Sequence, residues 1–436
     1  MSIVAPAVLV VFLCAYALVF LEERLHLKKS KPVMVAAGLI WIFVALGFAL
    51  DGRGPAVTAS IEHVVLEYAE LLLFLLSAIS FVNALVERRL FDALRARLTK
   101  GNISVRGIFW ATGLGAFCLS PVADNLTTAL VMGTIALSVL RGHNKAAVIT
   151  LVAIVVAANA GGAFSPFGDI TTLMVWQKGK LGFFEFFALF LPALLGWLVP
   201  ALVMSFFLPK DPIAASNETV RIRPGGITIA VLFLATIAGT VTLDHLLHLP
   251  PFLGMMTGLG VLNVYGYFLH GWEARAFATL PEAKSREPFN IFHIFQKIEW
   301  DTLLFFYGIM LCVGGLAAVG YLHSLSALLY AGSGPTIANI VIGLLSAIID
   351  NIPLTYAVLL MEPAMSHGQW LLVTLTAGTG GSLLSIGSAA GVALMGASKG
   401  LYTFNAHLKW AWAVALGYAV SIAAHLLLNA ELFQPR

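Results

Sequence analysis

Hydrophobic residues along this chain come in long runs, and polar and charged residues gather in the short segments between them. Predominantly apolar runs of 18 or more residues occur at 3–21, 32–50, 146–164 and 410–430. A helix of about 20 apolar residues crosses a hydrocarbon core about 30 Å thick. The pattern therefore predicts a bundle of membrane-spanning helices and no separate soluble domain.

Four of the apolar segments contain prolines or glycine-rich stretches that interrupt a helix. They are 103–141, interrupted near Pro121; 146–177, interrupted around NAGGAFSPFGD; 336–362, interrupted near Pro353; and 369–398, interrupted around GTGGSLLSIGS. Irregular backbone is tolerated at membrane depth only where protein or a water-filled cavity surrounds it. The four breaks therefore predict a polar site inside the membrane.

Positive charge is distributed unevenly between the loops. The loops 22–32, 87–106, 141–145, 209–224, 271–300 and 399–409 hold 21 of the 25 Lys and Arg residues. Because such residues mark cytoplasmic loops, we expect both termini outside and these loops inside. Both ends of 103–141 are then cytoplasmic and both ends of 336–362 are external. Each of these two segments is therefore predicted to be a re-entrant hairpin.

The two halves of the chain carry similar motifs in the same order. SPVADN at 120–125 matches SAIIDN at 346–351, and AGGAFSPFGD at 160–169 matches TGGSLLSIGS at 379–388. The matching segments have opposite predicted orientations, as in secondary transporters with a midplane site. We therefore expect an all-α polytopic membrane protein, an inverted-repeat secondary transporter with two re-entrant hairpins and two broken transmembrane helices.

This interpretation divides the chain into four parts. They are 1–54, the N-terminal transmembrane helices; 55–208, the first inverted repeat; 209–300, a linker with connecting transmembrane helices and a cytoplasmic loop; and 301–436, the core of the second repeat. The composition agrees, because 59% of residues are hydrophobic and only 11% are charged, against about 25% charged in soluble domains. The net charge of +3 lies in loops, so the expected partner is the lipid bilayer and not a nucleic acid.

Three aspartates fall inside the broken segments: Asp124, Asp169 and Asp350. A charge inside the membrane is costly and is usually functional. Burial favours the protonated form of a carboxyl group, whereas a bound cation favours the charged form. One carboxylate can therefore hold either a proton or a metal cation, which is the minimal chemistry of a cation/proton exchanger. The alternatives are that Asp124 and Asp350 cap half-helices, and that Asp169 lies in a solvated turn.

Neutral oxygen donors accompany these acids at the hairpin tips. The tips carry Ser120, Asn125, Ser346 and Asn351. With carbonyls freed by the breaks, their oxygens would suit a small hard cation such as Na⁺ or Li⁺. The alternative is that these four side chains only satisfy broken backbone.

The paired tips, Ser-x-x-x-Asp-Asn, resemble those of the ion transporter superfamily. Within it, SPVADNLTTALVMG, NAGGAFSPFGDITTLMVW and SAIIDNIPLTYAVLL resemble the NhaD-type sodium/proton antiporters, over roughly 55–430. The resemblance implies a homodimeric antiporter of the bacterial cytoplasmic membrane that exports Na⁺ or Li⁺ in exchange for H⁺, serves pH homeostasis, works by an elevator-type movement and needs no cofactor.

The resemblance also implies a set of cation and proton groups. These are Asp124, Asn125, Asn159, Asp169, Thr171, Thr172, Asp350, Asn351, Ser385 and Ser388. Asn159 has a glycine as its repeat counterpart, which suggests a ligand. Ser385 and Ser388 have the alternative role of letting helices pack closely.

A second polar group lies on the segment 60–86. His63, Glu67 and Glu70 are spaced so that they share one helix face, with Glu70 expected to lie deepest. The functional interpretation is a proton path or pH sensor; the alternative is a wet helix end or a buried ion pair. His293, His323, His367 and His407 fall in predicted loops and receive no role.

Two other functions fit parts of the sequence pattern. A Na⁺-coupled or proton-coupled anion transporter of the dicarboxylate or arsenite type would share the fold, but superfamily members that carry carboxylates have a neutral Ser-Asn-Thr at the tips, where this chain has Asp124 and Asp350. An intramembrane aspartyl protease is suggested by PFGD at 166–169 and LPAL at 191–194. Its motif is incomplete and the repeat would stay unexplained, so we expect no enzyme.

Overall fold

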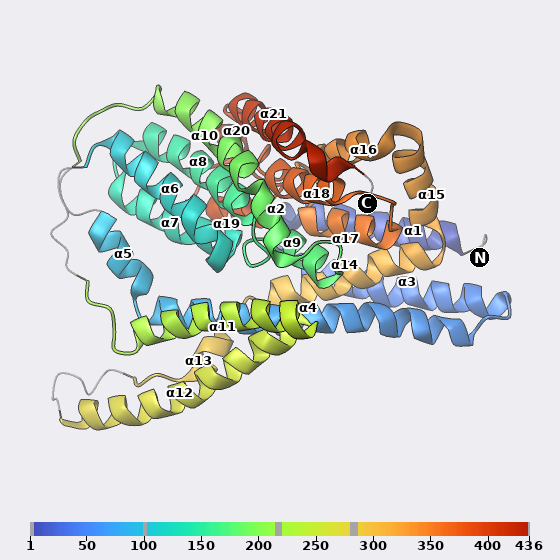
Figure 1. Ribbon diagram of the computed structural model, residues 1–436, viewed down its shortest axis with the longest axis horizontal. Coiled ribbons are helices and arrows are strands. Elements are labelled where there is room, and N and C mark those ends of the chain that lie inside the picture. The colour runs from blue at the N-terminus through green and yellow to red at the C-terminus, as the bar shows by residue number, and fades with distance from the viewer. Residues whose placement is uncertain (1–3, 99–102, 214–219, 280–286, 435–436) are drawn as a thin grey trace.

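The computed structural model describes residues 4–98, 103–213, 220–279 and 287–434. These residues form helices joined by short loops, with no strand among them and one isolated β-bridge between Ser104 and Pro212 (Figure 1). Ten of the described helices are long and apolar enough to cross a membrane. The prediction of an all-α polytopic membrane protein is confirmed.

One set of helices, here called the framework group, includes the long α4 and the α11–α12 hairpin along the lower edge of Figure 1. Its members are α1 (Ala5–Phe20), α2 (Glu22–Leu25), α3 (Ser30–Leu50), α4 (Pro55–Glu87), α5 (Leu90–Leu98), α11 (Gly226–Leu247), α12 (Pro251–Thr279), α13 (Ile291–Gln296) and α14 (Trp300–Ala318). Within it, α3 packs on α1 and α14, and α12 packs on α11 and α4.

The remaining helices, here called the hairpin group, contain the four predicted breaks. They are α6 (Val105–Ala123), α7 (Asn125–Val139), α8 (Asn144–Gly162), α9 (Ile170–Gln177), η1 (Phe183–Leu189), α10 (Phe190–Ser205), α15 (Tyr321–Ser326), η3 (Ala327–Ala331), α16 (Gly332–Leu345), α17 (Asn351–Met361), α18 (His367–Gly380), α19 (Ala389–Ala397), α20 (Phe404–Leu408), α21 (Ala411–Leu428) and η4 (Ala430–Phe433). Here α6 packs on α8, α16 on α18, and α10 on α21.

The helix breaks lie close to the expected places. Helix α6 continues through Pro121, and the chain turns at Asp124, whose φ of 56° is uncommon for a residue other than glycine. Pro353 does not break its segment. It lies in the first turn of α17, where a missing backbone N–H removes no helical hydrogen bond. The break in the segment 336–362 comes before Pro353, between α16 and α17.

One glycine in each half of the chain allows the hairpin to approach the broken helix beside it closely. A Cβ atom added to Gly161 would lie 2.4 Å from the carbonyl oxygen of Phe117, and one added to Gly380 would lie 2.0 Å from that of Gly343. Both distances are far below van der Waals contact. Glycine at these positions therefore holds α6 against α8 and α16 against α18.

Three sequence-based boundaries differ from the structure. The predicted span 3–21 forms a helix of only 16 residues, α1. The predicted cytoplasmic loop 271–300 begins as helix, because α12 continues to Thr279; its stretch 280–286 lies outside the described residues. The predicted loop 22–32 does not lie wholly at the molecular surface, since the side chain of Lys29 from this loop reaches Asp350 of the second hairpin.

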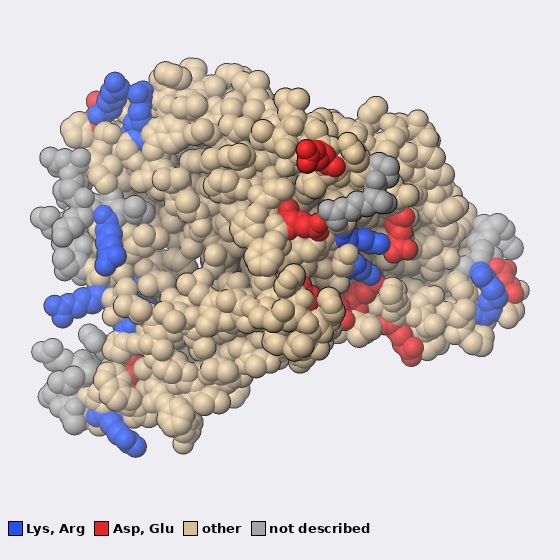
Figure 2. All heavy atoms as spheres, viewed as in Figure 1, with Lys and Arg blue, Asp and Glu red and all other residues tan. Residues whose placement is uncertain are grey.

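Basic side chains distinguish the two ends of the molecule. The Lys and Arg visible in Figure 2 gather mainly at the left end, where α5 lies, and both chain ends lie on the right in Figure 1.

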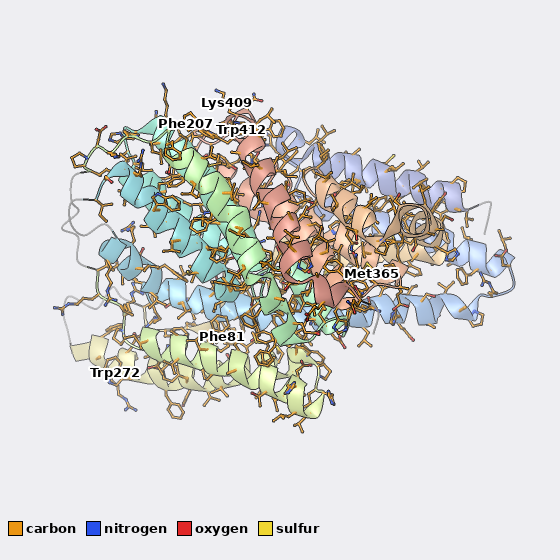
Figure 3. All side chains as sticks on the ribbon, turned by 45° about the horizontal axis from the view of Figure 1, so that its top comes forward. Phe81, Phe207, Trp272, Met365, Lys409 and Trp412 are labelled. Carbon is orange, nitrogen blue, oxygen red and sulfur yellow. The ribbon has the colours of Figure 1, made fainter. Side chains whose placement is uncertain are left out.

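Phe81 of α4 stacks on Phe233 of α11 with ring centres 4.9 Å apart and joins the two helices, whereas Trp272 of α12 points outward (Figure 3). The central site lies between the framework and hairpin groups.

Candidate functional site

Each helix break ends where a new half-helix begins, and a predicted site residue caps each of these half-helices. The caps are Asp124 of α7, Asp169 of α9, Asp350 of α17 and Ser388 of α19, and each accepts a hydrogen bond from a backbone N–H that follows it. A helix N-terminus carries partial positive charge. Three carboxylates and one hydroxyl therefore stand at four electropositive helix ends, so the capping role foreseen for Asp124 and Asp350 is present.

Asp169 receives hydrogen bonds from both hairpins. The Asn125 amide of the first hairpin donates to its Oδ2 at 2.8 Å, and the Asn351 amide of the second donates to the same oxygen at 3.2 Å. The backbone N–H and the hydroxyl of Thr171 both donate to Oδ1 at 2.9 Å. Asp169 is only 4% exposed. It therefore joins the two hairpin tips inside the protein and does not lie in a solvated turn.

Asn159 extends the network to the opposite broken helix. Its Oδ1 accepts from the amide of the first hairpin tip at 3.2 Å, and its Nδ2 donates to the hydroxyls of Ser382 at 2.8 Å and Ser388 at 2.9 Å. In the other half of the chain its counterpart is Gly378, where an added Cβ would lie 3.8 Å from Oδ2 of Asp169. That distance is an ordinary van der Waals contact, so Gly378 lies directly beside the carboxylate.

Two residues without a predicted role, His407 and Tyr402, extend this network beyond Ser382. The carbonyl of Ser382 is 2.9 Å from Nε2 of His407, and the hydroxyl of Tyr402 is 2.6 Å from Nδ1 of the same ring. Because a carbonyl can only accept, Nε2 carries the ring proton. Helix α20 lies outside the ten candidate spans, and burial lowers the pKa of His407 to about 4. The ring is therefore neutral. Nothing in the apolar pattern distinguishes this short helix from a loop.

Asp124 and Asp350 flank the centre but have different partners. The backbone N–H and the hydroxyl of Thr127 donate to the two oxygens of Asp124, both at 2.8 Å. Asp350 accepts from the N–H of Ile352 at 3.3 Å, and its Oδ2 lies 3.4 Å from Nζ of Lys29. One tip acid is thus held by neutral donors and the other by an ammonium group.

Several predicted ligands turn away from the centre. The hydroxyls of Ser120 and Ser346 donate to the carbonyls of Ala158 at 2.6 Å and Ala377 at 2.7 Å, and that of Thr172 donates to carbonyls of the α8–α9 break. These three hydroxyls satisfy broken backbone, which is the alternative considered for the tip serines. The structure does not bring them into the cavity at the site.

Ser385 also lies away from the cavity. It is fully buried, and its hydroxyl has no hydrogen-bond partner among the described residues. It lies in the α18–α19 break, and its carbonyl is 2.1 Å from the position of a Cβ added to Gly391. This close approach involves the backbone of Ser385 and depends on the missing side chain of Gly391.

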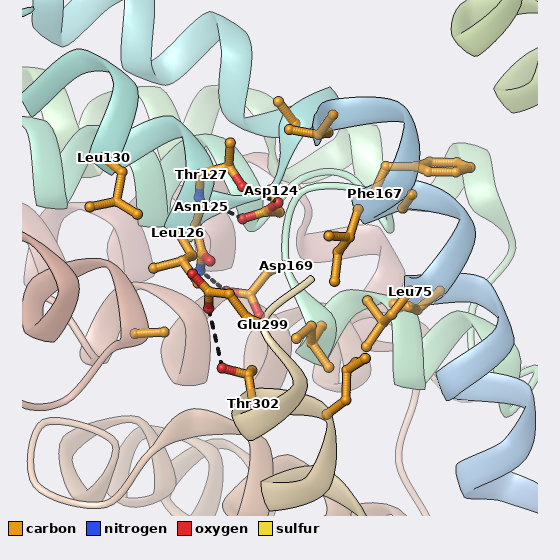
Figure 4. Close-up of a pocket in the computed structure, with 18 of the residues that line it drawn as sticks. Leu75, Asp124, Asn125, Leu126, Thr127, Leu130, Phe167, Asp169, Glu299 and Thr302 are labelled. Carbon is orange, nitrogen blue, oxygen red and sulfur yellow. Dashed lines mark hydrogen bonds between the residues drawn. The ribbon is translucent and has the colours of Figure 1, made fainter. Parts of the chain in front are cut away.

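A cavity of about 350 Å³ opens beside the tips, between them and α4 (Figure 4). Its polar wall contains Asp124, Asn125, Asp169, Asp350 and Asn351, and its apolar wall follows α4 over 74–86. Polar residues without a predicted role also line it, among them Lys29, Glu299 and Thr302. The hydroxyl of Thr302 donates to Glu299 at 3.3 Å. They were missed because they lie at helix ends next to predicted loops.

The donors fit a cation of low charge. Among the described residues, no three His, Cys, Asp or Glu side chains lie close enough to share one metal ion. Sites for Ca²⁺ commonly combine several carboxylates with carbonyl oxygens. Here a single central carboxylate, Asp169, is surrounded by amides and by half-helix ends, which favours a monovalent cation.

His63, Glu67 and Glu70 line a separate cavity of about 190 Å³. Glu67 is its hub: Oε1 lies 2.7 Å from Nε2 of His63 and pairs with Lys178, and Oε2 accepts from the Tyr356 hydroxyl at 2.8 Å. The side chain of Glu67 is 10% exposed. The arrangement is an ion-pair cluster, as in the alternative, with His63 65% exposed at its outer side, and it is centred on Glu67, not on Glu70.

Comparisons with known proteins place the chain in a family. A family model described as citrate transporter matches residues 16–378. The Na(+)/H(+) antiporter NhaD of Alkalimonas amylolytica is 54% identical, over 99% of this chain and 92% of that protein. This chain belongs to the NhaD family. NhaD of Vibrio cholerae is 52% identical over 99% and 93%. The sodium/proton antiporter 1 of Arabidopsis thaliana is 33% identical over 97% and 72%. The resemblance predicted from the motifs is confirmed.

Proposed function

We propose that this protein is a secondary Na⁺/H⁺ antiporter of a bacterial cytoplasmic membrane, which exports Na⁺ and Li⁺ in exchange for protons. Four relatives that are 50–54% identical bear the name Na(+)/H(+) antiporter NhaD. The observation that carries the proposal is the buried carboxylate of Asp169, held between the amides of Asn125 and Asn351 beside a cavity. Exchange is driven by ion gradients and needs no cofactor.

The proposed exchange takes place at this carboxylate and the two that flank it. When Asp169 is charged, it attracts a cation, and the amides of Asn125 and Asn351, which donate to Asp169 in this structure, turn to offer their oxygens as neutral ligands. When a proton neutralises Asp169, the charge that holds the cation is lost. Burial favours the proton and a bound Na⁺ favours the charge, so the two occupants exclude each other. Asp124 and Asp350 add charge on either side of the site.

Transport of an anion is the second candidate, because the matching family model is described as citrate transporter. Four helix N-termini at the site would attract an anion if their caps were neutral. Three of the four caps are aspartates, and Glu299 also lines the cavity. These carboxylates would repel a di- or tricarboxylate, which favours a cation. Uptake of labelled citrate is therefore expected to stay at the level of empty vesicles.

The proposed transport movement is an elevator-type shift of the hairpin group against the framework group. Two matching sets of packed helices support the predicted inverted repeat. The packing of α3 on α14 matches that of α12 on α4, and the packing of α6 on α8 matches that of α16 on α18. The cavity follows α4 and α7 toward the ends that carry the basic loops. With those loops in the cytoplasm and both termini outside, the site faces inward. A homodimer is proposed from the family resemblance.

The test uses everted membrane vesicles from a host without its own antiporters. Respiration acidifies the vesicles, and a fluorescent dye reports internal pH after addition of NaCl, LiCl or KCl. We expect Na⁺ and Li⁺ to dissipate the pH gradient with wild-type protein and not with Asp169→Asn. Absence of any cation response with well-expressed wild-type protein, combined with citrate uptake, would overturn the proposal in favour of the anion carrier.

A further inference from the structure

Lys29 lies between two cavities at the second hairpin tip. Its Nζ is 3.4 Å from Oδ2 of Asp350 and 4.3 Å from the centre of the Phe305 ring. Lys29 and Asp350 line both the central cavity and a neighbouring one of about 310 Å³. Their side chains are 19% and 17% exposed. The ion pair therefore stands on the route by which a cation would reach Asp350 from either cavity.

Residues of the framework group fix the backbone at Lys29. The backbone N–H of Lys29 donates to Glu22 at 3.4 Å, and the hydroxyl of the next residue, Ser30, donates to Asp301 at the start of α14. Asp350, in contrast, caps α17 in the hairpin group. The pair thus connects the two groups that are proposed to move against each other.

The two halves of the chain carry different residues three positions after the tip aspartate. Asp124 is followed three residues later by Thr127, which gives it two hydrogen bonds. The corresponding residue after Asp350 is Pro353, which has neither a backbone N–H nor a hydroxyl. Lys29 supplies Asp350 with the partner that Pro353 cannot. A carboxylate at membrane depth needs such compensation.

We propose that the Lys29 ammonium is a tethered competitor of the transported cation at Asp350. It occupies the carboxylate while the site is empty, and it moves aside when Na⁺ or Li⁺ binds. The inference rests on the proposed cation exchange at this site. Because a tethered group acts at a high effective concentration, Lys29 weakens cation binding and keeps the empty carrier neutral at this tip.

The test compares KM and maximal rate for Na⁺ in everted vesicles at one fixed pH. Coupling between two ligands at one protein usually changes affinity by about 5- to 150-fold, so we expect Lys29→Gln to lower the KM by about 5-fold or more. Lys29→Arg keeps the charge and is expected to stay near the wild-type KM. Lys31→Gln, which removes an exposed charge two residues away, from a side chain that lines neither cavity, is the matched control and is expected to leave the KM unchanged.

A second measurement separates competition from a structural role. Na⁺-dependent thermal stabilisation of the purified protein is followed for wild type, Lys29→Gln, Asp350→Asn and the double variant. We expect Lys29→Gln to respond at lower Na⁺ concentration, and this gain to vanish in the Asp350→Asn background. An unchanged or raised KM in folded Lys29→Gln protein, with no gain in Na⁺ response, would overturn the inference. A wild-type protein without Na⁺ response would instead overturn the proposed function.

Discussion

Replacing Asp169 by asparagine tests whether this residue is the ionised centre of the hydrogen-bond network. The carboxylate accepts from four donor groups on two sides, the amides of Asn125 and Asn351 and the two donors of Thr171. An asparagine has only one accepting oxygen. With its NH₂ toward Thr171 it would face a backbone N–H that cannot reverse. With its NH₂ toward the tips it would face two amide donors.

Either orientation leaves a buried donor without a partner, which costs about 1–3 kcal/mol. That free energy corresponds to a roughly 5- to 150-fold change in the folding equilibrium. Turning Asn125 around gives no relief, since its oxygen would then face the oxygen of Asn159, which now accepts from it. We therefore expect Asp169→Asn to be less stable than wild type and to lose Na⁺ transport.

Asp124→Asn is the matched control. Its two oxygens accept from the backbone N–H and the hydroxyl of Thr127. A hydroxyl can donate or accept, so the new NH₂ finds a partner and stability is expected to change by less than about 1 kcal/mol. The assay is unfolding by SDS in mixed micelles, followed by tryptophan fluorescence. Equal midpoints for Asp169→Asn and wild type would refute the reasoning, because they would mean that Asp169 is protonated and itself donates one of these bonds.

Three further outcomes are expected. Gly380→Ala pushes a Cβ to 2.0 Å from the carbonyl of Gly343 and should cost about 1–3 kcal/mol in the same unfolding assay, whereas Gly239→Ala, with open space around it, should be neutral. Glu67→Gln breaks the outer ion pair and should lower the melting temperature, but change the KM for Na⁺ by less than about twofold, because distant sites act independently; a larger change in KM would join the two cavities functionally. His407, with its pKa lowered to about 4 from 6.5, takes up a proton more readily when unfolded, so stability should fall as pH drops through that window, and a melting series on His407→Gln should show a shallower slope.

The sequence was sufficient for most of the long helices, for the four breaks and for the polar residues within them. Acids and amides stand out in apolar runs because they are costly there, and this identified Asp169 and Asn125 without a structure. Their pairing could not be predicted, because hydrogen bonds between segments far apart in the chain depend on packing. For the same reason the pattern did not distinguish Asn125, which faces the centre, from Ser120, which turns to a carbonyl.

Lys29 illustrates a different limit. The loop-charge rule counts basic residues by the loop in which they occur and carries no information on depth. Lys29 was therefore grouped with the other basic residues of 22–32, although it pairs with Asp350. Glu299 was missed because it stands one residue before α14, where charged residues usually mark the end of a span. Charged side chains at the ends of membrane spans need a structure before they can be assigned.

The shared position of Asp169 has a consequence for stoichiometry. Both hairpin tips, one from each half of the chain, bind the same carboxylate. Asp124 and Asp350 line the same cavity as this shared acid, so the three carboxylates form one site and the two tips cannot be filled independently. On the proposed assignment, Na⁺ dependence should be hyperbolic, with a Hill coefficient of one. The repeated architecture would then supply both sides of one site, and the number of cations bound there would stay at one.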